Sequence, residues 1–331
     1  RLAQGKRTEI ELGDTATVDA LFRRNVLVAG KPRQPARILD PAAALDGHAQ
    51  KVPVLQKMQA ATARAESLPP QVSDQAGQTY VRIPNGAMQV DGNCRIVITQ
   101  PFYMATTETT VGRFRKFVEA TGHVTDAEIH GGDVRIPPGT RRTGKEFNWK
   151  SPGFPQGDDH PVAQVSRRDA IAFCDWLTKV DGVRHRLPTE MEWEWACRAG
   201  TVTKYHFGDD ARELGRSAWY RDNTANGTGT RPVGQLLPNA WGLHDMHGNL
   251  LEWVHDRVGP YPLGTAIDWQ GSMDQQQNSF VARGGAFDGT AEDCAASSYR
   301  PVAGWHGGHE FAVHHFGFRV VRELPQPEGE K

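Results

Sequence analysis

A turn-forming residue interrupts the second half of the chain every few positions, and this pattern restricts the fold more than any other feature. The 331 residues include 35 Gly and 21 Pro, which end or weaken regular helices. The 9 Trp residues can still supply the large side chains of a sizeable core. From Gly200 onward we therefore expect short strands joined by irregular loops rather than a helical bundle.

Helix signals lie mainly between residues 110 and 200. Three segments combine a side chain that can cap the first turn with an apolar stripe behind it. The expected caps are Thr110, Ser166 with Asp169, and Thr189 with Glu192. Gly122 and Gly200 can end the first and the last of these helices. Because strand-like alternation at 80–84 and 95–98 precedes them, the sequence predicts an α+β domain.

The first 75 residues differ from the rest of the chain. They contain no Trp, and a short helix at 54–65 is the only regular element that they suggest. Pro69 and Pro70 end this helix. We therefore interpret 1–75 as an N-terminal extension, 76–325 as the folded domain and 326–331 as a tail.

Charge and hydropathy exclude two classes of partner. The formal net charge is −1 and the isoelectric point is about 7.0, so the chain lacks the positive field that attracts nucleic acid. The longest apolar runs fall short of the roughly 18 residues that a membrane-spanning helix needs. We therefore expect an unknown protein or small molecule as the partner, with no nucleic acid and no membrane span.

The four cysteines, Cys94, Cys174, Cys197 and Cys294, lie far apart in the sequence. No CxxC pair occurs, which argues against a thiolate zinc site. The spacing is compatible with buried free thiols or with one or two long-range disulfides.

Three blocks of sequence carry a family resemblance. Residues 186–200 read RLPTEMEWEWACRAG, residues 238–253 read PNAWGLHDMHGNLLEW, and RGG at 283–285 precedes GFRVV at 317–321. In this order and spacing the blocks resemble the sulfatase-modifying-factor, or formylglycine-generating-enzyme-like, family over about residues 78–322. The resemblance implies a loop-rich, C-type-lectin-like α+β fold. We also expect Arg283 and Arg319 to pair with buried carboxylates such as Glu192 or Glu252.

The chain departs from this family at the active site. The resemblance implies two cysteines between RGG and GFR that bind copper, but residues 286–293 contain none. Ala286 stands where the family has serine, and Leu251 stands where it has tryptophan. Without a thiolate pair no soft Cu(I) site of that type remains. We therefore expect no copper, no catalytic residue of the family's kind and no formylglycine formation.

The resemblance further implies a structural calcium ion. Family members hold Ca²⁺ in the loop that corresponds to residues 245–252. Carried over, the side chains of Asp245 and Glu252 and the backbone carbonyls of Gly248 and Leu250 would supply the oxygen ligands that calcium prefers. The competing interpretation is that Asp245 and Glu252 only hydrogen-bond the turn.

The resemblance also bears on Cys197 and Cys294, which occupy positions that pair in secreted relatives. In an oxidising compartment they are expected to form a disulfide, whereas in a reducing cytosol both would stay free and buried. The sequence does not fix the compartment, and the cell surface, the periplasm or secretion is only slightly favoured over the cytoplasm.

Residues 286–316 lie between two frames, 283–285 and 317–319, that look like paired core strands. In this respect the segment resembles the ligand-binding region of variable proteins from diversity-generating retroelements. Segments between fixed strands can change without unfolding the core, and aromatic and polar side chains suit recognition. We therefore expect a non-catalytic ligand-binding protein. Its predicted exposed binding residues are Phe287, Asp288, Trp305, His306, His309, Glu310, His314 and His315.

Several alternatives remain open at this point. The segment is either diversified by a retroelement or part of a non-variable binding or scaffold domain. The chain can also be an enzyme of the same family with a different, metal- and O₂-dependent oxidoreductase chemistry. Residues 305–315 contain four histidines and Glu310, and two histidines with one carboxylate can hold non-haem iron; the competing interpretation is an exposed polar loop. Trp305 and Phe316 can fold into the core instead of facing solvent.

Overall fold

The computed structural model describes residues 36–325 apart from 92, 137–139, 226, 272–278 and 304–311. Its helices are α2 (Pro41–Ala44), α3 (Lys51–Glu66), α4 (Val111–Thr121), α5 (Asp126–His130), α6 (Arg167–Asp181), α7 (Glu190–Arg198) and the 3-10 turns η1 (Ala211–Arg216) and η2 (Arg221–Asn223). Its strands are β1 (Arg37–Leu39), β2 (Gln71–Ser73), β3 (Thr79–Ile83), β4 (Gly86–Asp91), β5 (Cys94–Ile98), β6 (Phe102–Ala105), β7 (Gly132–Ile136), β8 (Thr140–Gly144), β9 (His185–Arg186), β10 (Leu251–Arg257), β11 (Gly264–Ile267), β12 (Ser279–Arg283), β13 (Tyr299–Ala303), β14 (Phe316–Gly317) and β15 (Val321–Arg322). The predicted α+β, loop-rich class is confirmed.

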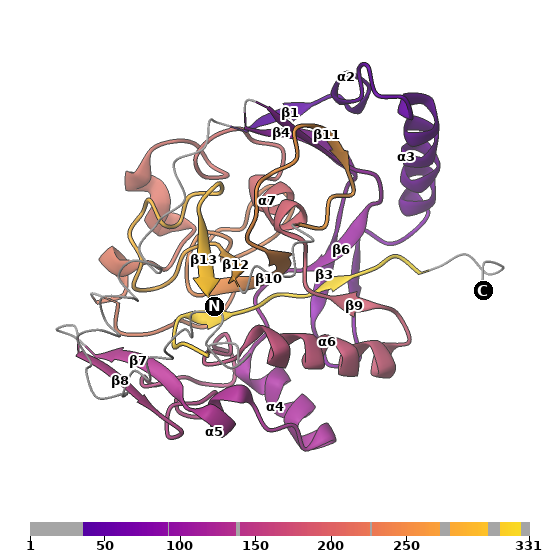
Figure 1. The fold of residues 1–331 in the computed structure, drawn as a ribbon. Helices are drawn as coiled ribbons and strands as arrows, with labels where there is room; N and C mark the ends of the chain where they lie inside the picture. Colours follow the sequence, from indigo (N-terminus) through magenta and orange to yellow (C-terminus); the bar gives the residue numbers. More distant parts are fainter. Residues whose placement is uncertain are drawn as a thin grey trace, which may run out of the picture.

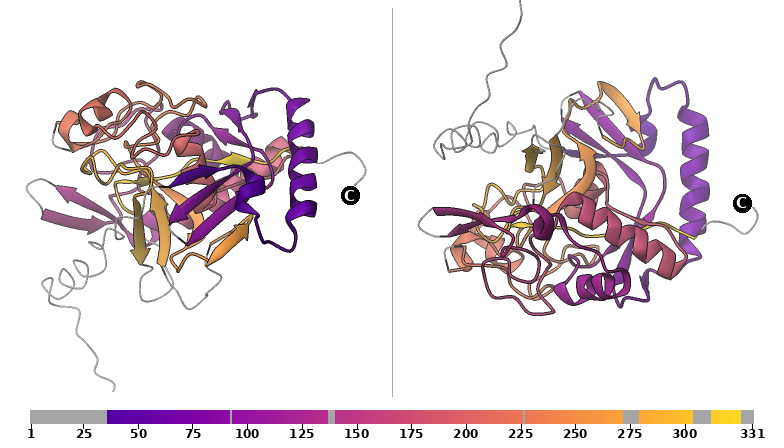
Figure 2. Two further views of the ribbon diagram at one scale, coloured as in Figure 1. Left: turned by 90° about the horizontal axis from the view of Figure 1, so that it is seen from above. Right: turned by 60° about the horizontal axis from the view of Figure 1, so that its bottom comes forward.

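The strands of the described residues form several short β-sheets. Their strand orders are β1-β4-β5-β11, β13-β12-β10-β14, β2-β3-β6-β15-β9 and β7-β8. Helices α4 and α6 lie together, well away from α3 (Figure 1). Helix α3 stands at the edge of the molecule in the two further views as well (Figure 2).

The predicted helix starts are confirmed. The expected cap hydrogen bonds are present at Thr110, at Ser166 with Asp169 and at Thr189 with Glu192. Helix α4 ends at Gly122 as predicted, but α7 ends before Gly200, because Ala199 already adopts a left-handed φ of +46°. Among the described residues no helix combines the length and apolar character that a membrane crossing requires.

The described part of the N-terminal extension packs onto the domain. Strand β1 pairs antiparallel with β4. Helix α3 begins at Lys51, before the predicted start, and buries Val54, Met58 and Ala61. Val54 and Met58 share a core cluster with Val97 of β5. Residues 36–75 therefore belong to the same packed unit as the sheets, and residues 1–35 lie outside the described part of the chain.

Strand β10 is bonded to both frames of the 286–316 segment. It pairs antiparallel with β12, where Glu252 lies opposite Arg283, and parallel with β14, where Glu252 lies opposite Gly317. The expectation that the two frames pair with each other is wrong, because β10 lies between them. The segment consequently starts and ends on opposite sides of one strand.

A buried ion pair connects the sequence motifs. Arg319 donates hydrogen bonds to both carboxylate oxygens of Glu252 at 2.6 and 2.7 Å, and both side chains are fully buried. Trp193 Nε1 donates to the same carboxylate at 2.7 Å. The predicted partner of Arg319 is therefore confirmed, and its contacts join α7, β10 and the residues before β15.

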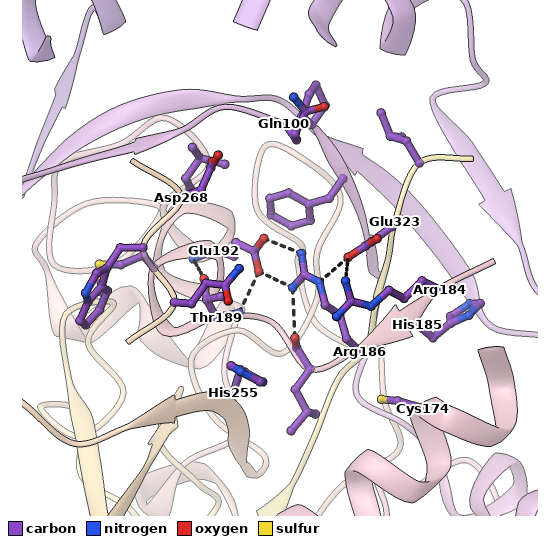
Figure 3. Close-up of a pocket in the computed structure, with 18 of the residues that line it drawn as sticks. Gln100, Cys174, Arg184, His185, Arg186, Thr189, Glu192, His255, Asp268 and Glu323 are labelled. Atoms are coloured by element: carbon purple, nitrogen blue, oxygen red, sulfur yellow. Dashed lines mark hydrogen bonds and ion pairs between the residues drawn. The ribbon is translucent and has the colours of Figure 1, made fainter. Parts of the chain in front are cut away.

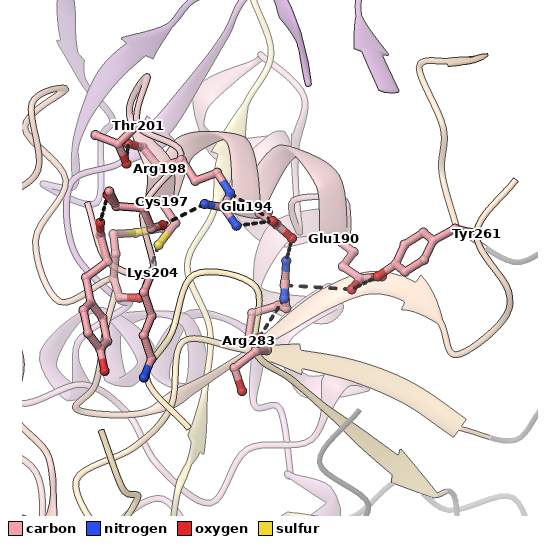
Figure 4. A network of polar contacts seen from close by, with 12 residues as sticks. Glu190, Glu194, Cys197, Arg198, Thr201, Lys204, Tyr261 and Arg283 are labelled. Carbon is pink, nitrogen blue, oxygen red and sulfur yellow. Dashed lines mark hydrogen bonds and ion pairs between the residues drawn. The ribbon is translucent and has the colours of Figure 1, made fainter. Parts of the chain in front are cut away.

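Arg283 also pairs with a buried carboxylate, but with neither Glu192 nor Glu252. Its partner is Glu194, which also accepts two hydrogen bonds from Arg198 (Figure 4). Glu192 instead completes the cap of α7 and accepts two hydrogen bonds from Arg186 at 2.7 Å. Positions two apart on a helix differ by about 200° around the axis, so Glu192 and Glu194 face opposite sides of α7.

Replacing Arg319 with methionine should lower the free energy of unfolding by about 3–5 kcal/mol, because the Glu252 carboxylate stays buried without its counter-charge. Urea denaturation followed by circular dichroism measures this loss. Arg115→Met is the control, since the Arg115–Asp158 pair is solvent-exposed (side chains 41% and 66% accessible) and exposed ion pairs contribute little to stability. Equal losses in the two variants would contradict the stabilising role of the buried pair.

Candidate functional site

The first residues of the 286–316 segment are held by hydrogen bonds from neighbouring loops. The Phe287 backbone N–H donates to the Asn249 carbonyl at 2.8 Å. Thr224 Oγ1 donates to the Phe287 carbonyl at 2.7 Å, and Arg221 Nε donates to the Asp288 carbonyl at 2.9 Å. These contacts fix the backbone on both sides of the Asp288 side chain.

The two ends of the segment bring one carboxylate and two imidazoles together. Asp288 Oδ2 lies 3.7 Å from His314 Nε2 and 3.6 Å from His315 Nδ1. The ligand atoms of all three residues lie within 4.8 Å of one another, and no other such trio of His, Cys, Asp or Glu is found among the residues that the structure describes. We call this group the Asp288 cluster.

Backbone contacts orient the two imidazoles. The His314 backbone N–H donates to the Asp133 carbonyl at 3.1 Å, and His314 Nδ1 lies 3.3 Å from the same oxygen. With Nδ1 facing a carbonyl, Nε2 is the nitrogen that faces Asp288. The His315 carbonyl accepts a hydrogen bond from the Leu251 N–H of β10 at 2.9 Å. The cluster is thus attached to β7 and to β10.

Burial and charge act in opposite directions on the Asp288 carboxyl group. Burial alone would raise its pKa, but His315, His314 and Arg300 outweigh burial and hold the pKa well below the usual range. Asp288 is therefore an anionic donor. Its side chain is 30% exposed, whereas those of His314 and His315 are 5% and 9% exposed, so solvent reaches the cluster from the carboxylate side.

The predicted exposed face differs from the observed arrangement. Phe287, His314 and His315 are buried, and only Asp288 of the described candidates is partly open. The reason is ring packing: Phe287 lies 5.2 Å from Phe154 and 5.9 Å from His314, measured between ring centroids. The remaining predicted residues, Trp305, His306, His309 and Glu310, lie outside the described part of the chain.

Phe316 also packs inward. It is buried and stacks on Trp253 with a centroid distance of 4.6 Å. The core alternative is therefore confirmed for Phe316. A signal for the cluster was present in the sequence, because Asp288 closely follows one frame and His314-His315 lie shortly before the other.

A pocket of about 480 Å³ contains none of the cluster residues, but one of its walls begins at Thr228, next to Gly227, which packs against Asp288. It is lined by Pro155, Gln156, Gly157, His160, Thr228, Gly229, Thr230, Arg231 and Pro232. The loop that forms one wall also contacts the cluster, since a Cβ atom on Gly227 would lie 2.9 Å from Asp288 Cα. His160 Nδ1 lies 3.0 Å from Thr230 Oγ1, and burial lowers the His160 pKa. No pattern in the sequence pointed to this pocket.

A second pocket, of about 420 Å³, contains none of the predicted site residues (Figure 3). Its wall includes Arg186, which donates to Glu192 and to Glu323. Arg184 donates to Glu323 as well. Because these charges are paired within the wall, they stabilise the fold rather than offer charge to a ligand.

The residues of the predicted calcium set have different environments. Both Glu252 oxygens are engaged by Arg319, so Glu252 does not fit the role of a calcium ligand. Asp245 fits better: it is buried, Oδ2 accepts from the Gly234 N–H at 2.7 Å, and Oδ1 has no hydrogen-bond partner. Burial raises the Asp245 pKa, and the charge of Glu252 raises it further.

A nearby carboxylate that the sequence did not suggest is Glu108. It is fully buried, and Oε1 accepts a hydrogen bond from the Leu250 N–H at 3.2 Å. Burial raises the Glu108 pKa, with further contributions from Asp245 and Glu252. Leu250 therefore contacts Glu108 through its backbone N–H, whereas the calcium prediction used its carbonyl. Gly248 packs against the backbone of Trp219, where a Cβ atom would clash.

Cys197 and Cys294 are both free and buried, so the predicted disulfide is not formed in this structure. The His247 imidazole contacts both residues: its Nε2 lies 3.8 Å from Cys197 Sγ, and its Nδ1 lies 2.8 Å from the Cys294 carbonyl. Burial raises the pKa of the Cys197 thiol to about 12. Cys94 and Cys174 are free and buried as well.

Comparisons with known proteins agree with this geometry. The family model described as "Sulfatase-modifying factor enzyme 1-like domain" matches residues 59–324. The formylglycine-generating enzyme of Thermomonospora curvata is 30% identical over 270 residues, which cover 70% of this chain and 86% of the relative. The "Inactive C-alpha-formylglycine-generating enzyme 2" of Bos taurus is 28% identical over 296 residues, covering 77% of this chain and 92% of the relative.

A solved structure shares the fold. Treponema denticola variable protein 1 superposes with a TM-score of 0.61 and 21% identity, covering 78% of this chain and 100% of that one. The match over 59–324 spans both frames, the capped helices α4, α6 and α7, and the buried arginine pairs. The chain therefore belongs to the sulfatase-modifying factor enzyme 1-like family.

Proposed function

We propose that this chain is a non-catalytic, ligand-binding member of its family, with the binding face around Asp288 and the adjacent pocket. The observation that carries the proposal is the state of Cys294, the only cysteine of the 286–316 segment. Its side chain is fully buried, and burial raises its pKa well above the usual range. A buried thiol is inert as a nucleophile or copper ligand. Residues 286–316 can therefore bind a ligand without carrying out thiol chemistry.

The pocket beside the cluster supplies the polar groups of the proposed binding face. His160, Thr230 and Arg231 offer an imidazole, a hydroxyl and a guanidinium group within one wall. A few polar groups that converge on a pocket are typical of ligand sites. The positive charge of Arg231 favours an acidic small molecule or an acidic side chain of a protein partner. Retroelement diversification of 286–316 remains part of this proposal, and a template repeat beside the gene would support it.

A second function is favoured by one observation. Two imidazoles and one carboxylate in the Asp288 cluster form the donor set of metal- and O₂-dependent oxidoreductases. Oxidation of a cysteine-free substrate that depends on added Fe²⁺ and O₂ would support this alternative over simple binding.

We expect no formylglycine formation. The protein is incubated with a peptide containing the CxPxR motif of sulfatases and with Cu(I), and mass spectrometry follows the cysteine. The peptide mass should stay unchanged, because no exposed thiolate pair is present to bind copper. The Thermomonospora curvata enzyme, assayed in parallel, is the positive control. Turnover above the level without protein would contradict the proposal.

Acidic ligands should bind through the pocket wall. Saturation-transfer NMR against small carboxylates, phosphates and acidic peptides should identify binders whose signal is lost in Arg231→Met and kept in the surface control Arg115→Met. Affinity should rise as the pH falls below about 6.5, because His160 has a lowered pKa and gains its positive charge only there. No binder, or equal binding by both variants, would contradict the proposed face.

We further propose that the calcium ion implied by the family binds at Asp245 with Glu108 rather than Glu252. A cation there would offset two buried carboxylates that Arg319 alone does not neutralise. Excess EGTA should lower the melting temperature by several degrees, since a bound ion at about 100 times its Kd contributes roughly 2.7 kcal/mol. Asp245→Asn should remove this dependence, and Asp288→Asn should keep it. An unchanged melting temperature, with no calcium by elemental analysis, would argue against the ion.

A further inference from the structure

We propose that Asp288, His314 and His315 form a binding site for one divalent first-row transition-metal ion. This site is separate from the proposed calcium position at Asp245 and lies where the two ends of the 286–316 segment meet. The inference does not depend on whether the chain binds an organic ligand.

The separations between donor atoms suit a central ion better than direct hydrogen bonds. Asp288 Oδ2 lies 3.7 Å from His314 Nε2 and 3.6 Å from His315 Nδ1, longer than the roughly 2.7–3.2 Å of an N–H···O bond. Metal–ligand bonds of about 2.1 Å at angles of 90–109° place neighbouring donors about 3.0–3.4 Å apart. With all three donors within 4.8 Å, small side-chain rotations reach that geometry.

The surrounding backbone holds the histidine ligands in place. His314 is fixed by the Asp133 carbonyl, which accepts from its backbone N–H and lies 3.3 Å from Nδ1. A backbone carbonyl opposite the second ring nitrogen is the usual arrangement of metal-bound histidine, because it selects the tautomer and the ring orientation. His315 is anchored to β10 through its carbonyl. The two rings lie edge to face, 4.7 Å apart between centroids.

The donor types select the class of ion. Two imidazole nitrogens and one carboxylate oxygen suit Zn²⁺, Fe²⁺ or Co²⁺, whereas Ca²⁺ prefers oxygen ligands alone and Cu(I) prefers thiolates. Three protein ligands leave at least one coordination position for water or another molecule. The 30% exposure of the Asp288 side chain places that open position toward solvent, near Gly227, which packs against Asp288.

Metal titration tests the site directly. Tag-free protein, stripped with EDTA, is titrated with CoCl₂ while the visible d–d absorption is recorded, and Zn²⁺ binding is measured by calorimetry. We expect one ion per chain. Because loss of even an outer-shell partner weakens metal binding about 10–100-fold, removing a ligand in Asp288→Asn or His314→Gln should weaken it at least about 100-fold. His255→Gln, which removes an exposed imidazole outside the cluster, should bind as the wild type does.

Two further measurements keep the outcome unambiguous. The metal-free variants are compared with the wild type by circular dichroism and melting temperature, and Asp288→Asn preserves the shape of a partly exposed side chain, so folding should be retained. The double variant His306→Gln/His309→Gln should keep the Co²⁺ site. Absence of binding by the wild type overturns the proposal. So does full binding by both folded cluster variants, or loss of binding only in the His306/His309 variant.

Discussion

The pairing of Arg319 with Glu252 is the interaction on which the remaining structure depends. Removing two charges from water is costly unless their geometry and hydrogen bonds are nearly complete, and here Trp193 supplies a further donor to the same carboxylate. Arg319 also donates to the His244 carbonyl. Through Trp193 and Arg319, the Glu252 carboxylate therefore connects β10 with α7, with the residues before β15 and with the loop that contains His244.

The same strand determines where the candidate site forms. Arg283 of β12 and Gly317 of β14 both lie opposite Glu252, so chain segments more than thirty residues apart emerge at one level of the sheet. Asp288 follows the first of these strands and His315 immediately precedes the second. The strand order thus brings a carboxylate and two imidazoles together at one place on this sheet.

Local features of the fold could be predicted and long-range ones could not. The caps at Thr110 and Thr189 depend on neighbours three residues away, so the sequence reveals them. Glu192 was suggested as a partner of Arg283 or Arg319 but pairs with neither, for a reason that was also local: a side chain that caps its own helix cannot face the core on the other side. The position of the two frames in the sheet could not be predicted, because β10, which precedes both frames in the sequence, lies between them in space.

The candidate site was predicted only in part for a similar reason. Asp288, His314 and His315 were three of the eight residues predicted for one exposed face, because a segment between two fixed frames was expected to display its aromatic and imidazole rings at the surface. Phe287 and His314 are buried because loops from distant parts of the chain, such as the one containing Phe154, cover them. Glu108 was missed because its relation to Asp245 exists only after folding.

The order of the strands has a consequence for biosynthesis. Strand β15, the last of the described chain, lies between β6 and β9, and β14 closes the edge of the β10 sheet. A growing polypeptide that ends before them holds an incomplete sheet and a Glu252 without its arginine. Although domains generally begin to fold from the N-terminus during synthesis, this one can complete its core only once its final strands have left the ribosome. Premature termination near the C-terminus should therefore release a chain that quality-control proteases recognise as unfolded.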